Sequence, residues 1–319
     1  MGVRLSDWVE CVPNFSEGRS SEVLKRLRQT FEASDVKLLD QTSDPDHHRS
    51  VFTIAGRIPS VADALLRVAE VAVNEINLVS HRGEHPRIGA LDVVPLVAMD
   101  GTSREACVAG ANQIAESLWS RLGVPVYLYG QAARSVERQA LESIRKLGFE
   151  HLREAADSPA YLPDIGGPAL HPTAGATCVG VRGFLIAFNV ELQSSDVSIA
   201  RQIAKQVRES SGGLAGVKAL GLQLATRDAV QVSMNITDIT RTPLHRAVSA
   251  VCEAATALGV EVARGELIGL LPRAAAEATS AEELRLEAIT PSMILEDRLE
   301  LWQENAGAGT IKSQRETLR

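Results

Sequence analysis

Cysteine is scarce in this chain, and the few cysteines lie far apart. No two of them form a Cys-x-x-Cys pair; the 4 residues are Cys11, Cys107, Cys178 and Cys252. This spacing predicts neither a disulfide framework nor a cysteine-ligated zinc site. The His-Glu-x-x-His pattern is also missing, and the adjacent His47 and His48 would point to opposite sides of a strand. The sequence therefore predicts no metal site.

Long apolar runs and an excess of basic charge are missing as well. No apolar run approaches the roughly 20 residues that span a membrane, and the N-terminus MGVRLSDWVE lacks the apolar core of a signal peptide. The net charge of −7 argues against nucleic acid as the main partner. With 45% hydrophobic residues, the composition is that of a globular protein. We expect a cytoplasmic protein with no membrane or nucleic-acid partner.

The most distinctive segment is 80–95, SHRGEHPRIGALDVVP, which follows a helical pattern at 59–78 and leads into a strand-like run at 92–99. A loop between helix and strand needs only a turn. This one instead carries titratable and guanidinium side chains, namely His81, Arg82, Glu84, His85 and Arg87. Single residues of these types are common in solvated loops. Their density here favours a binding or catalytic loop.

Three further polar segments stand at strand ends or between the halves of the chain. One is 14–18, NFSEG, which offers hydrogen bonds to a ligand but is also typical of a helix cap. The second is 44–49, DPDHHR. The third, 164–175, contains glycines and prolines that exclude helix and central strand, and it is either a plain linker or a close backbone approach to a ligand. We expect residues 10–18, 44–49, 80–92 and 164–175 to line one cleft between the two sheets.

The order of predicted elements repeats. Strands at 8–13, 36–42, 49–56 and 92–99 with helices at 20–33 and 59–78 spell βαββαβ. Strands at 183–191, 217–225, 229–236 and 259–263 with helices at 195–210 and 243–258 spell it again. This predicts an α+β fold of two duplicated ferredoxin-like subdomains, 1–180 and 181–302, followed by a disordered tail at 303–319. A helical insert separates the halves.

The insert itself has recognisable boundaries. A capping box, Thr102-Ser103-Arg104-Glu105, opens its first helix, and Gly123 is placed to end it. A strand at 126–129 and a helix at 133–146 are predicted to follow.

Several strings in this chain resemble the glutamate formiminotransferase family, the folate enzymes of histidine breakdown. They are ECVPNFSEGR (10–19), HRGEHPRIGALDVVP (81–95), VPVYLYGQAAR (124–134), PDIGGPALHPTAGATCVGVRGFLIAFNVEL (163–192) and ELIGLLP (266–272). The resemblance runs from about Val9 to Leu301. It is to the stand-alone form, without the cyclodeaminase domain to which the animal enzymes are fused.

This resemblance implies an enzyme that transfers the formimino group of N-formimino-L-glutamate to N5 of tetrahydrofolate, with the folate as co-substrate and no metal. His85 matches the family's catalytic histidine and would act as base and then acid. The expected substrate-binding residues are Asn14, Asp44, Arg49 and Arg87, because an arginine fork binds both oxygens of a carboxylate. The implied folate-binding residues are Gly166, Gly167, Pro168, Ala169, Leu170, His171, Pro172, Thr173, Ala174 and Gly175. The family also suggests a homodimer.

Two choices stay open at this point. The animal enzymes have an acidic residue near the position that Thr42 occupies here. Because threonine is not acidic, the acidic partner of His85 must be another residue, either Glu84 or an aspartate of 44–46. The same groups could instead transfer a formyl group between 5-formyltetrahydrofolate and glutamate. Alternatively, the chain could be a folate-binding module without turnover. His85 together with Arg87 favours catalysis, because a binding module needs no proton carrier.

Overall fold

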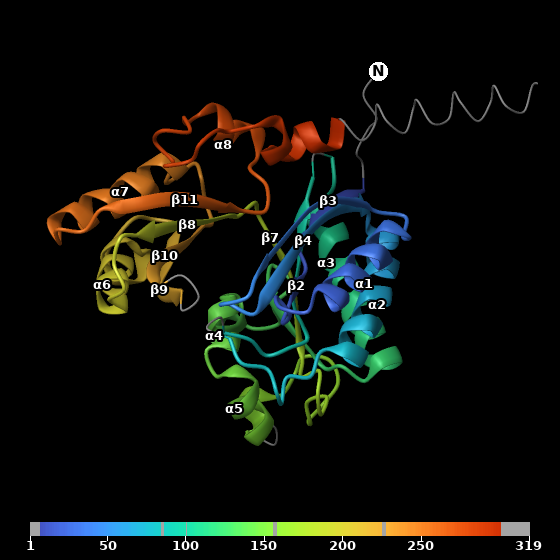
Figure 1. The fold of residues 1–319 in the computed structure, drawn as a ribbon. Helices are drawn as coiled ribbons and strands as arrows, with labels where there is room; N and C mark the ends of the chain where they lie inside the picture. The colour runs from blue at the N-terminus through green and yellow to red at the C-terminus, as the bar shows by residue number, and fades with distance from the viewer. Residues whose placement is uncertain (1–6, 84–85, 100, 156–157, 225–227, 301–319) are drawn as a thin grey trace, which may run out of the picture. The chain divides into compact units, whose positions relative to one another are not determined.

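The computed structural model of the chain describes residues 7–83, 86–99, 101–155, 158–224 and 228–300. The chain divides into two compact units, Met1–Gly183 and Phe184–Arg319. Both combine helices with a β-sheet, so the protein has a mixed α+β fold (Figure 1). The tail predicted at 303–319 lies outside the described residues. Within the described part of the chain, no helix is both long and apolar enough to cross a membrane.

The first unit is built on a seven-stranded sheet, counted over the described residues. Its strands are β1 (Trp8–Cys11), β2 (Asn14–Phe15), β3 (Lys37–Asp44), β4 (Arg49–Arg57), β5 (Leu91–Ala98), β6 (Val126–Gly130) and β7 (Thr177–Arg182). β1 and β2 both pair with β4 on one side and β5 on the other. β3 lies beyond β4, while β7 and then β6 extend the sheet beyond β5 by parallel pairing.

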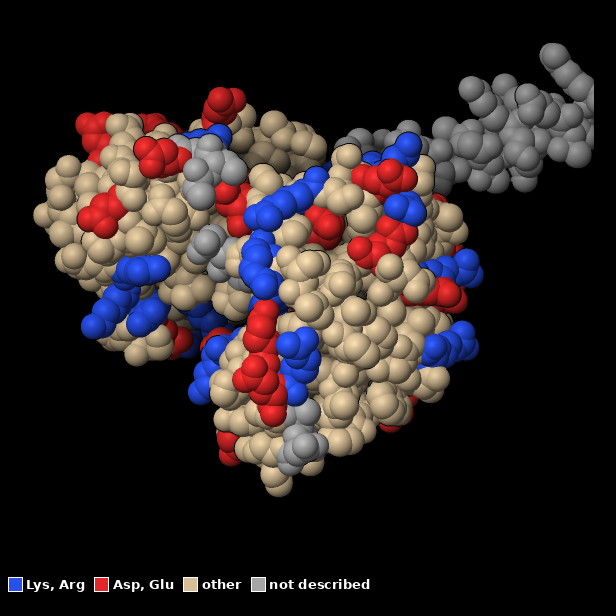
Figure 2. All heavy atoms as spheres, turned by 60° about the horizontal axis from the view of Figure 1, so that its bottom comes forward, with Lys and Arg blue, Asp and Glu red and all other residues tan. Residues whose placement is uncertain are grey.

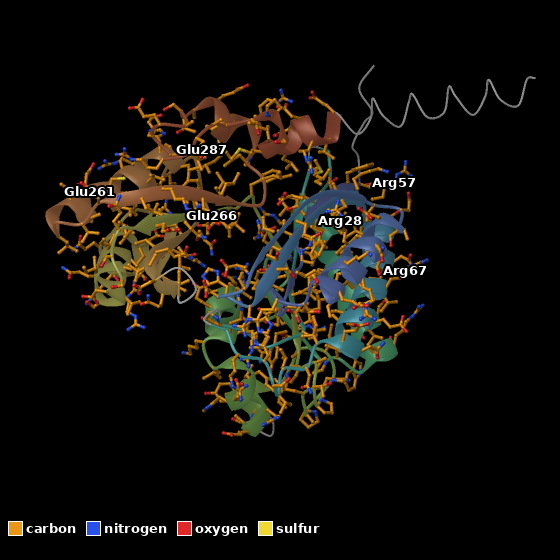
Figure 3. All side chains as sticks on the ribbon, viewed as in Figure 1. Arg28, Arg57, Arg67, Glu261, Glu266 and Glu287 are labelled. Atoms are coloured by element: carbon orange, nitrogen blue, oxygen red, sulfur yellow. The ribbon has the colours of Figure 1, made fainter. Side chains whose placement is uncertain are left out.

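Three helices of the first unit lie on the same side of this sheet (Figure 1): α1 (Ser21–Glu32), α2 (Ile58–Glu75) and α3 (Arg104–Leu122). Each presents an apolar stripe to the core. In α1 the buried residues Val23, Leu27 and Phe31 recur every fourth position, which places them on one helix face. The opposite faces are polar. Arg67 of α2 points away from the sheet (Figure 3) and pairs with Asp63 at 2.9 Å.

The expected capping box of α3 is displaced by one residue. Ser103, not Thr102, is the N-cap, because its hydroxyl accepts a hydrogen bond from the Ala106 amide at 3.1 Å. The Thr102 hydroxyl instead donates to the Trp8 carbonyl at 2.7 Å and ties the helix start to the first strand. At the other end Gly123 has a φ of 65°, the left-handed conformation that commonly ends a helix.

The single helix predicted at 133–146 is wrong. The segment forms a 3-10 turn at Val136–Arg138, the short α4 (Leu141–Arg145) and, after Gly148, α5 (Gly148–Glu154). The Gln139 carbonyl accepts a hydrogen bond from the Gly130 amide at 3.1 Å. It is therefore engaged with the end of β6 and not with the next helical turn. A tertiary contact here overrides local helix propensity.

The second unit has a four-stranded antiparallel sheet, in the order β11-β8-β10-β9. Its strands are β8 (Ile186–Leu192), β9 (Val217–Leu224), β10 (Ala229–Ile236) and β11 (Val262–Ile268). The helices α6 (Val197–Val207) and α7 (Leu244–Ala257) pack on it. Short elements complete the unit at Glu209–Ser211, α8 (Arg273–Glu277) and Pro291–Met293, as Pro159–Tyr161 does in the first unit. The predicted strand at 183–191 starts at Ile186.

Candidate functional site

Two of the predicted polar loops, 14–18 and 80–92, lie side by side in the first unit. The Ser16 hydroxyl donates to the Gly89 carbonyl at 2.7 Å, and the Ser16 amide donates to the Ala90 carbonyl at 2.9 Å. The reason is the sheet itself, because β2 and β5 are paired and each loop adjoins one of them. Residues more than 70 positions apart in the sequence are thereby brought together at the same end of this strand pair.

The polar segment 44–49 packs against both of these loops at their glycines. A Cβ on Gly18 would lie 2.2 Å from the Asp44 carbonyl oxygen, and one on Gly83 would lie 2.5 Å from the His47 carbonyl oxygen. Neither distance leaves room for a side chain, so only glycine permits this approach of one backbone to another. The glycines therefore allow these three polar loops to pack closely together.

Asn14 and Arg49, both expected to bind substrate, contact each other. The Asn14 amide nitrogen donates to the Val12 carbonyl at 2.7 Å, while its side-chain oxygen accepts hydrogen bonds from Nε (2.9 Å) and Nη2 of Arg49. Burial lowers the pKa of Arg49 to about 10, and repulsion from Arg145 adds to this shift. Arg49 is thus a charged, positioned guanidinium at neutral pH.

Asp44 holds the turn that precedes Arg49. Its Oδ1 accepts hydrogen bonds from the amides of Asp46 and His47, both at 2.8 Å. The same oxygen lies 3.9 Å from Nδ1 of His47. These bonds are those of an Asx turn, and they fix the direction in which residues 47–49 leave it.

His48 occupies a conformation that non-glycine residues rarely adopt, with a φ of 50°. Its Nδ1 lies 3.0 Å from the Arg82 carbonyl oxygen, and its Nε2 lies 3.2 Å from Oε1 of Glu17. Burial alone would raise the pKa of Glu17. Hydrogen bonds from the Ser20 and Arg19 amides, together with His48, lower that pKa below its ordinary value. Glu17 is therefore a carboxylate that anchors the His48 ring.

His81 stacks on His48, with ring centroids 4.0 Å apart and ring planes within 5°. Its Nε2 lies 2.9 Å from the His48 carbonyl oxygen, whereas its buried Nδ1 has no hydrogen-bond partner among the described residues. Burial lowers the pKa of His81 to about 4. His81 is thus a neutral imidazole at physiological pH.

Arg87 is held by other groups of the first unit. Its guanidinium binds both carboxylate oxygens of Glu150 on α5, at 2.8 and 3.2 Å, and donates to the His81 carbonyl at 3.1 Å. The hydrogen bond from Arg87 keeps the pKa of Glu150 below its ordinary value. This arginine therefore fixes the loop as well as lining the pocket described below.

Asp92 and Arg145 form a buried ion pair that no local sequence pattern predicts. Oδ2 of Asp92 lies 2.7 Å from Nη2 of Arg145, which also donates to the Pro86 carbonyl. Oδ1 of Asp92 accepts hydrogen bonds from the Ile88 and Gly89 amides at 2.7 and 3.1 Å. Asp92 lies within the motif of the loop, but Arg145 comes from α4 and carries no local signal.

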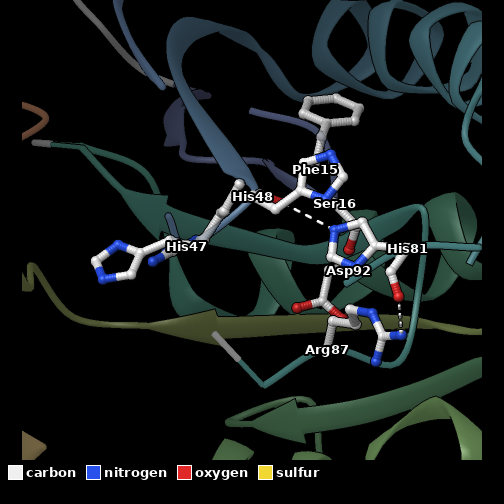
Figure 4. Close-up of a pocket in the computed structure, with 8 residues that line it drawn as sticks. Phe15, Ser16, His47, His48, His81, Arg87 and Asp92 are labelled. Carbon is white, nitrogen blue, oxygen red and sulfur yellow. Dashed lines mark hydrogen bonds between the residues drawn. The ribbon is translucent and has the colours of Figure 1, made fainter. Parts of the chain in front are cut away.

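Several of the side chains described above line one small pocket (Figure 4). Its cavity volume is about 10 Å³, roughly the room that one water molecule needs. Its lining residues are Phe15, Ser16, His47, His48, Arg49, His81, Arg87 and Asp92.

The glycine-rich segment 166–175 does not line this pocket but touches the same loop. The Leu78 amide donates to the Thr173 carbonyl and the Ala90 amide to the Ala174 carbonyl, both at 2.8 Å. Nδ1 of His171 accepts the Ala174 amide at 3.0 Å, and burial lowers the pKa of His171. The other end of the segment, at Gly166, packs on Trp119 instead.

The predicted catalytic His85, with Glu84, lies outside the described residues. Of the predicted groups, the structure brings together Asn14, Asp44, Arg49 and Arg87. Sequence reasoning did not single out Glu17 and His48 as partners, nor Arg145. In the described ranges no three His, Cys, Asp or Glu side chains gather as metal ligands would. Cys11, Cys107 and Cys178 are buried and Cys252 is partly exposed, all as free thiols.

The sequence of this chain matches family models and known proteins along most of its length. Residues 8–182 match the N-terminal subdomain of the formiminotransferase domain, and residues 187–290 match the formiminotransferase domain. The glutamate formimidoyltransferase of Thermoplasma acidophilum is 40% identical over 295 residues, covering 92% of this chain and 97% of the relative. That of Streptococcus pyogenes serotype M1 is 41% identical over 265 residues, covering 83% and 89%.

The formimidoyltransferase-cyclodeaminase of Gallus gallus is 40% identical over 274 residues, covering 84% of this chain but 50% of the relative. This chain thus spans half of the fused animal protein and nearly the whole of the two microbial relatives. The two family matches together take in most of both units. The chain therefore belongs to the formiminotransferase family.

Proposed function

We propose that this protein transfers the formimino group from N-formimino-L-glutamate to N5 of tetrahydrofolate and releases glutamate. The observation that carries the proposal is the match to two relatives named glutamate formimidoyltransferase along almost their full lengths. The lining of the pocket supports it, since it includes the positioned guanidinium of Arg49, and arginine is suited to binding a carboxylate.

The reaction sets three requirements. N5 of the folate attacks the amidine carbon and forms a new C–N bond, and the C–N bond to glutamate then breaks. A base must remove the N5 proton, and an acid must protonate the leaving nitrogen. Cationic donors must also hold the substrate carboxylates. We assign both proton transfers to His85, because a histidine pKa near neutrality lets one group act as base and then acid.

For the carboxylates we propose Arg49, with Asn14 and Asp44 fixing its position, and Arg87. Arg49 lines the pocket and is oriented by Asn14, which is the preorganisation that a carboxylate clamp needs. Arg87 also lines the pocket, although its guanidinium already binds Glu150. Its proposed role therefore needs a test that separates substrate binding from loop structure.

For the folate we propose the segment Gly166–Gly175. Its Thr173–Gly175 end is hydrogen-bonded to the loop that continues into the pocket. Its glycines at positive φ, 79° at Gly166 and 72° at Gly175, shape the backbone without side chains in the way. Exposed peptide groups there could read the amide edge of a pterin.

The finer architecture is also part of the proposal. We propose that subdomains 1–180 and 181–302 are duplicated ferredoxin-like units. The strand orders support this, because the second sheet runs β11-β8-β10-β9 and the first runs β5, β1 with β2, β4, β3 in the equivalent places. β7 and β6 would then be additions to the first unit.

We also propose that the protein is a cytoplasmic homodimer that acts on small molecules, as the family suggests. The net charge of −7 supports the absence of a nucleic-acid partner, and acidic as well as basic side chains are visible in Figure 2.

The test is a turnover assay with formiminoglutamate and tetrahydrofolate, run beside a binding titration with 5-formyltetrahydrofolate. Formation of 5-formiminotetrahydrofolate with release of glutamate supports the proposal. Binding of 5-formyltetrahydrofolate without turnover of any donor would instead identify a folate-binding module. Turnover of formyl donors alone would identify the protein as a formyltransferase.

A further inference from the structure

The two ring nitrogens of His81 have different surroundings. Nε2 lies 2.9 Å from the His48 carbonyl oxygen. A carbonyl oxygen only accepts hydrogen bonds, so Nε2 carries the proton. On a neutral ring Nδ1 is then a bare lone pair. The contact with His48 therefore decides which tautomer His81 adopts.

The surroundings of the ring also keep it neutral. The His48 ring, which lies against the Arg82 carbonyl oxygen and the Glu17 carboxylate, stacks on His81 at 4.0 Å and opposes a positive charge there. Burial disfavours a charge on His81 most, Arg87 opposes it as well, and Glu17 favours it more weakly.

The bare nitrogen is buried, and it has no hydrogen-bond partner in the described part of the chain. His81 is 4% exposed and lines the pocket. Figure 4 shows the ring beside His48, with Asp92 and Arg87 around the same space. Buried polar atoms are nearly always paired, so an unpaired acceptor at a pocket wall marks the place of a donor.

We infer that Nδ1 of His81 accepts a hydrogen bond from the terminal N–H of the substrate's formimino group and so selects formimino over formyl donors. This rests on the proposed function and names the residue that decides its donor. The terminal nitrogen of a formimino group carries hydrogen, whereas the matching oxygen of a formyl group has only lone pairs. A formyl oxygen in this place would point a lone pair at the lone pair of His81 Nδ1, and the two would repel each other. A binding site can favour one ligand by such repulsion of its analogue.

Two substitutions separate the two nitrogens. In His81→Gln the longer amide can still donate to the His48 carbonyl, but no acceptor remains near the position of Nδ1. In His81→Asn the shorter side chain places an amide oxygen near Nδ1 and does not reach that carbonyl. His151→Ala, an exposed histidine on α5, is the matched control for loss of an imidazole.

The measurement compares N-formimino-L-glutamate with N-formyl-L-glutamate. The first has a terminal nitrogen that carries hydrogen and, at neutral pH, a positive charge, whereas the second has a neutral oxygen in that place. The readout is the inhibition constant of the second, measured in competition, divided by KM for the first, so that a larger ratio means a stronger preference for the formimino compound. His81→Gln should lower the preference for the formimino compound by about tenfold to a hundredfold, the effect of losing one buried hydrogen bond. His81→Asn should keep most of the preference, and His151→Ala all of it.

An unchanged preference in His81→Gln, or an equal loss with both compounds, would overturn the inference and leave His81 a structural ring. The ¹⁵N resonances of the imidazole provide an independent test, because they distinguish a bare Nδ1 from a protonated one in the free protein. A protonated Nδ1 would also overturn the inference. If the tautomer is as stated but the wild-type protein turns over no formiminoglutamate, the proposed function fails instead.

Discussion

The two units of this chain share a run of elements, β-α-β-β-α-β, yet they bury different kinds of side chain. In the described part of the first unit the buried polar residues are Glu10, Asn14, Ser16, Asp46, His47, Ser50, Thr53, His81, Asp92 and Thr177. In that of the second unit they are Asn189, Gln231 and Thr242. The second unit is thus close to a plain apolar core under a sheet. The first carries a polar cluster where its loops meet.

One ion pair from each unit illustrates the contrast. The Arg145–Asp92 pair of the first unit is 13% and 4% exposed, whereas the Arg246–Glu253 pair of the second is 55% and 67% exposed. Taking charges out of water costs free energy that their attraction often does not recover. Stability alone therefore gives no reason to bury them. The two units therefore show that the order of helices and strands does not by itself distinguish them. What marks the candidate site in the first unit is its buried polar and charged side chains, whose burial is costly.

The largest effect should come from His85 in the first unit. His85→Ala should reduce kcat by about 10²–10⁴-fold with little change in folate affinity, because a proton carrier is lost. The acidic limb of the pH profile of kcat/KM should disappear with it. His245→Ala, a partly buried histidine of the second unit, should leave kcat near wild type. Near wild-type turnover in His85→Ala, or a larger loss in His81→Ala, would show that the base is another group.

The next effect sharpens the comparison of ion pairs. Asp92→Ala leaves the Arg145 guanidinium buried without its carboxylate and should lower the free energy of unfolding by about 3–5 kcal/mol. Glu253→Ala breaks an exposed pair and should change it by at most about 1 kcal/mol. Denaturant unfolding of the full chain measures both. Equal effects would mean that burial does not distinguish the two units energetically.

Stability should also depend on pH through His81. Its pKa is 6.5 in a solvated chain and about 4 in the folded protein, so the unfolded state binds the proton more readily between these values. The free energy of unfolding should therefore fall as the pH is lowered from 6.5 to 4, by on the order of 3 kcal/mol. His81→Gln should remove this component, seen as a smaller difference between urea midpoints at neutral and acidic pH. An identical pH dependence in both proteins would contradict a buried neutral ring.

The smallest effect concerns the two arginines. Arg49→Gln should raise KM for formiminoglutamate by the equivalent of about 1.5–3 kcal/mol, and much more than it raises KM for the folate. Arg87→Gln should do the same if its guanidinium reaches the substrate. Glu150→Gln is the control, because it removes the partner of Arg87 but not the positive charge. Matching effects of Arg87→Gln and Glu150→Gln, on both substrates alike, would identify Arg87 as an arginine that only holds the loop.

Periodic segments were the part of the fold open to prediction. The α2 pattern and the strands at 49–56, 92–99, 217–225 and 229–236 appear close to their expected bounds, because alternating or helical burial leaves a repeating mark in the residues themselves. The glycines and charges of the loops also pointed to the region where the pocket lies. The mixed α+β class followed from these elements.

What the sequence could not supply depends on contacts between distant residues. β7 joins the first sheet through parallel pairing with β5 and β6, and the helix expected at 133–146 breaks where its backbone bonds to β6. The partnership of Arg145 with Asp92 joins α4 to a loop more than 50 residues earlier, and no local pattern encodes it.

The sequence by itself determined the periodic elements, the family and the loops that carry polar groups, because these are properties of neighbouring residues and of whole strings. Only the tertiary structure decided which atoms those groups present. The His81 tautomer depends on one carbonyl of His48, and the His48 ring depends on Glu17 from another loop. Hydrogen-bond direction and burial arise from three-dimensional contact, so a list of residues does not contain them.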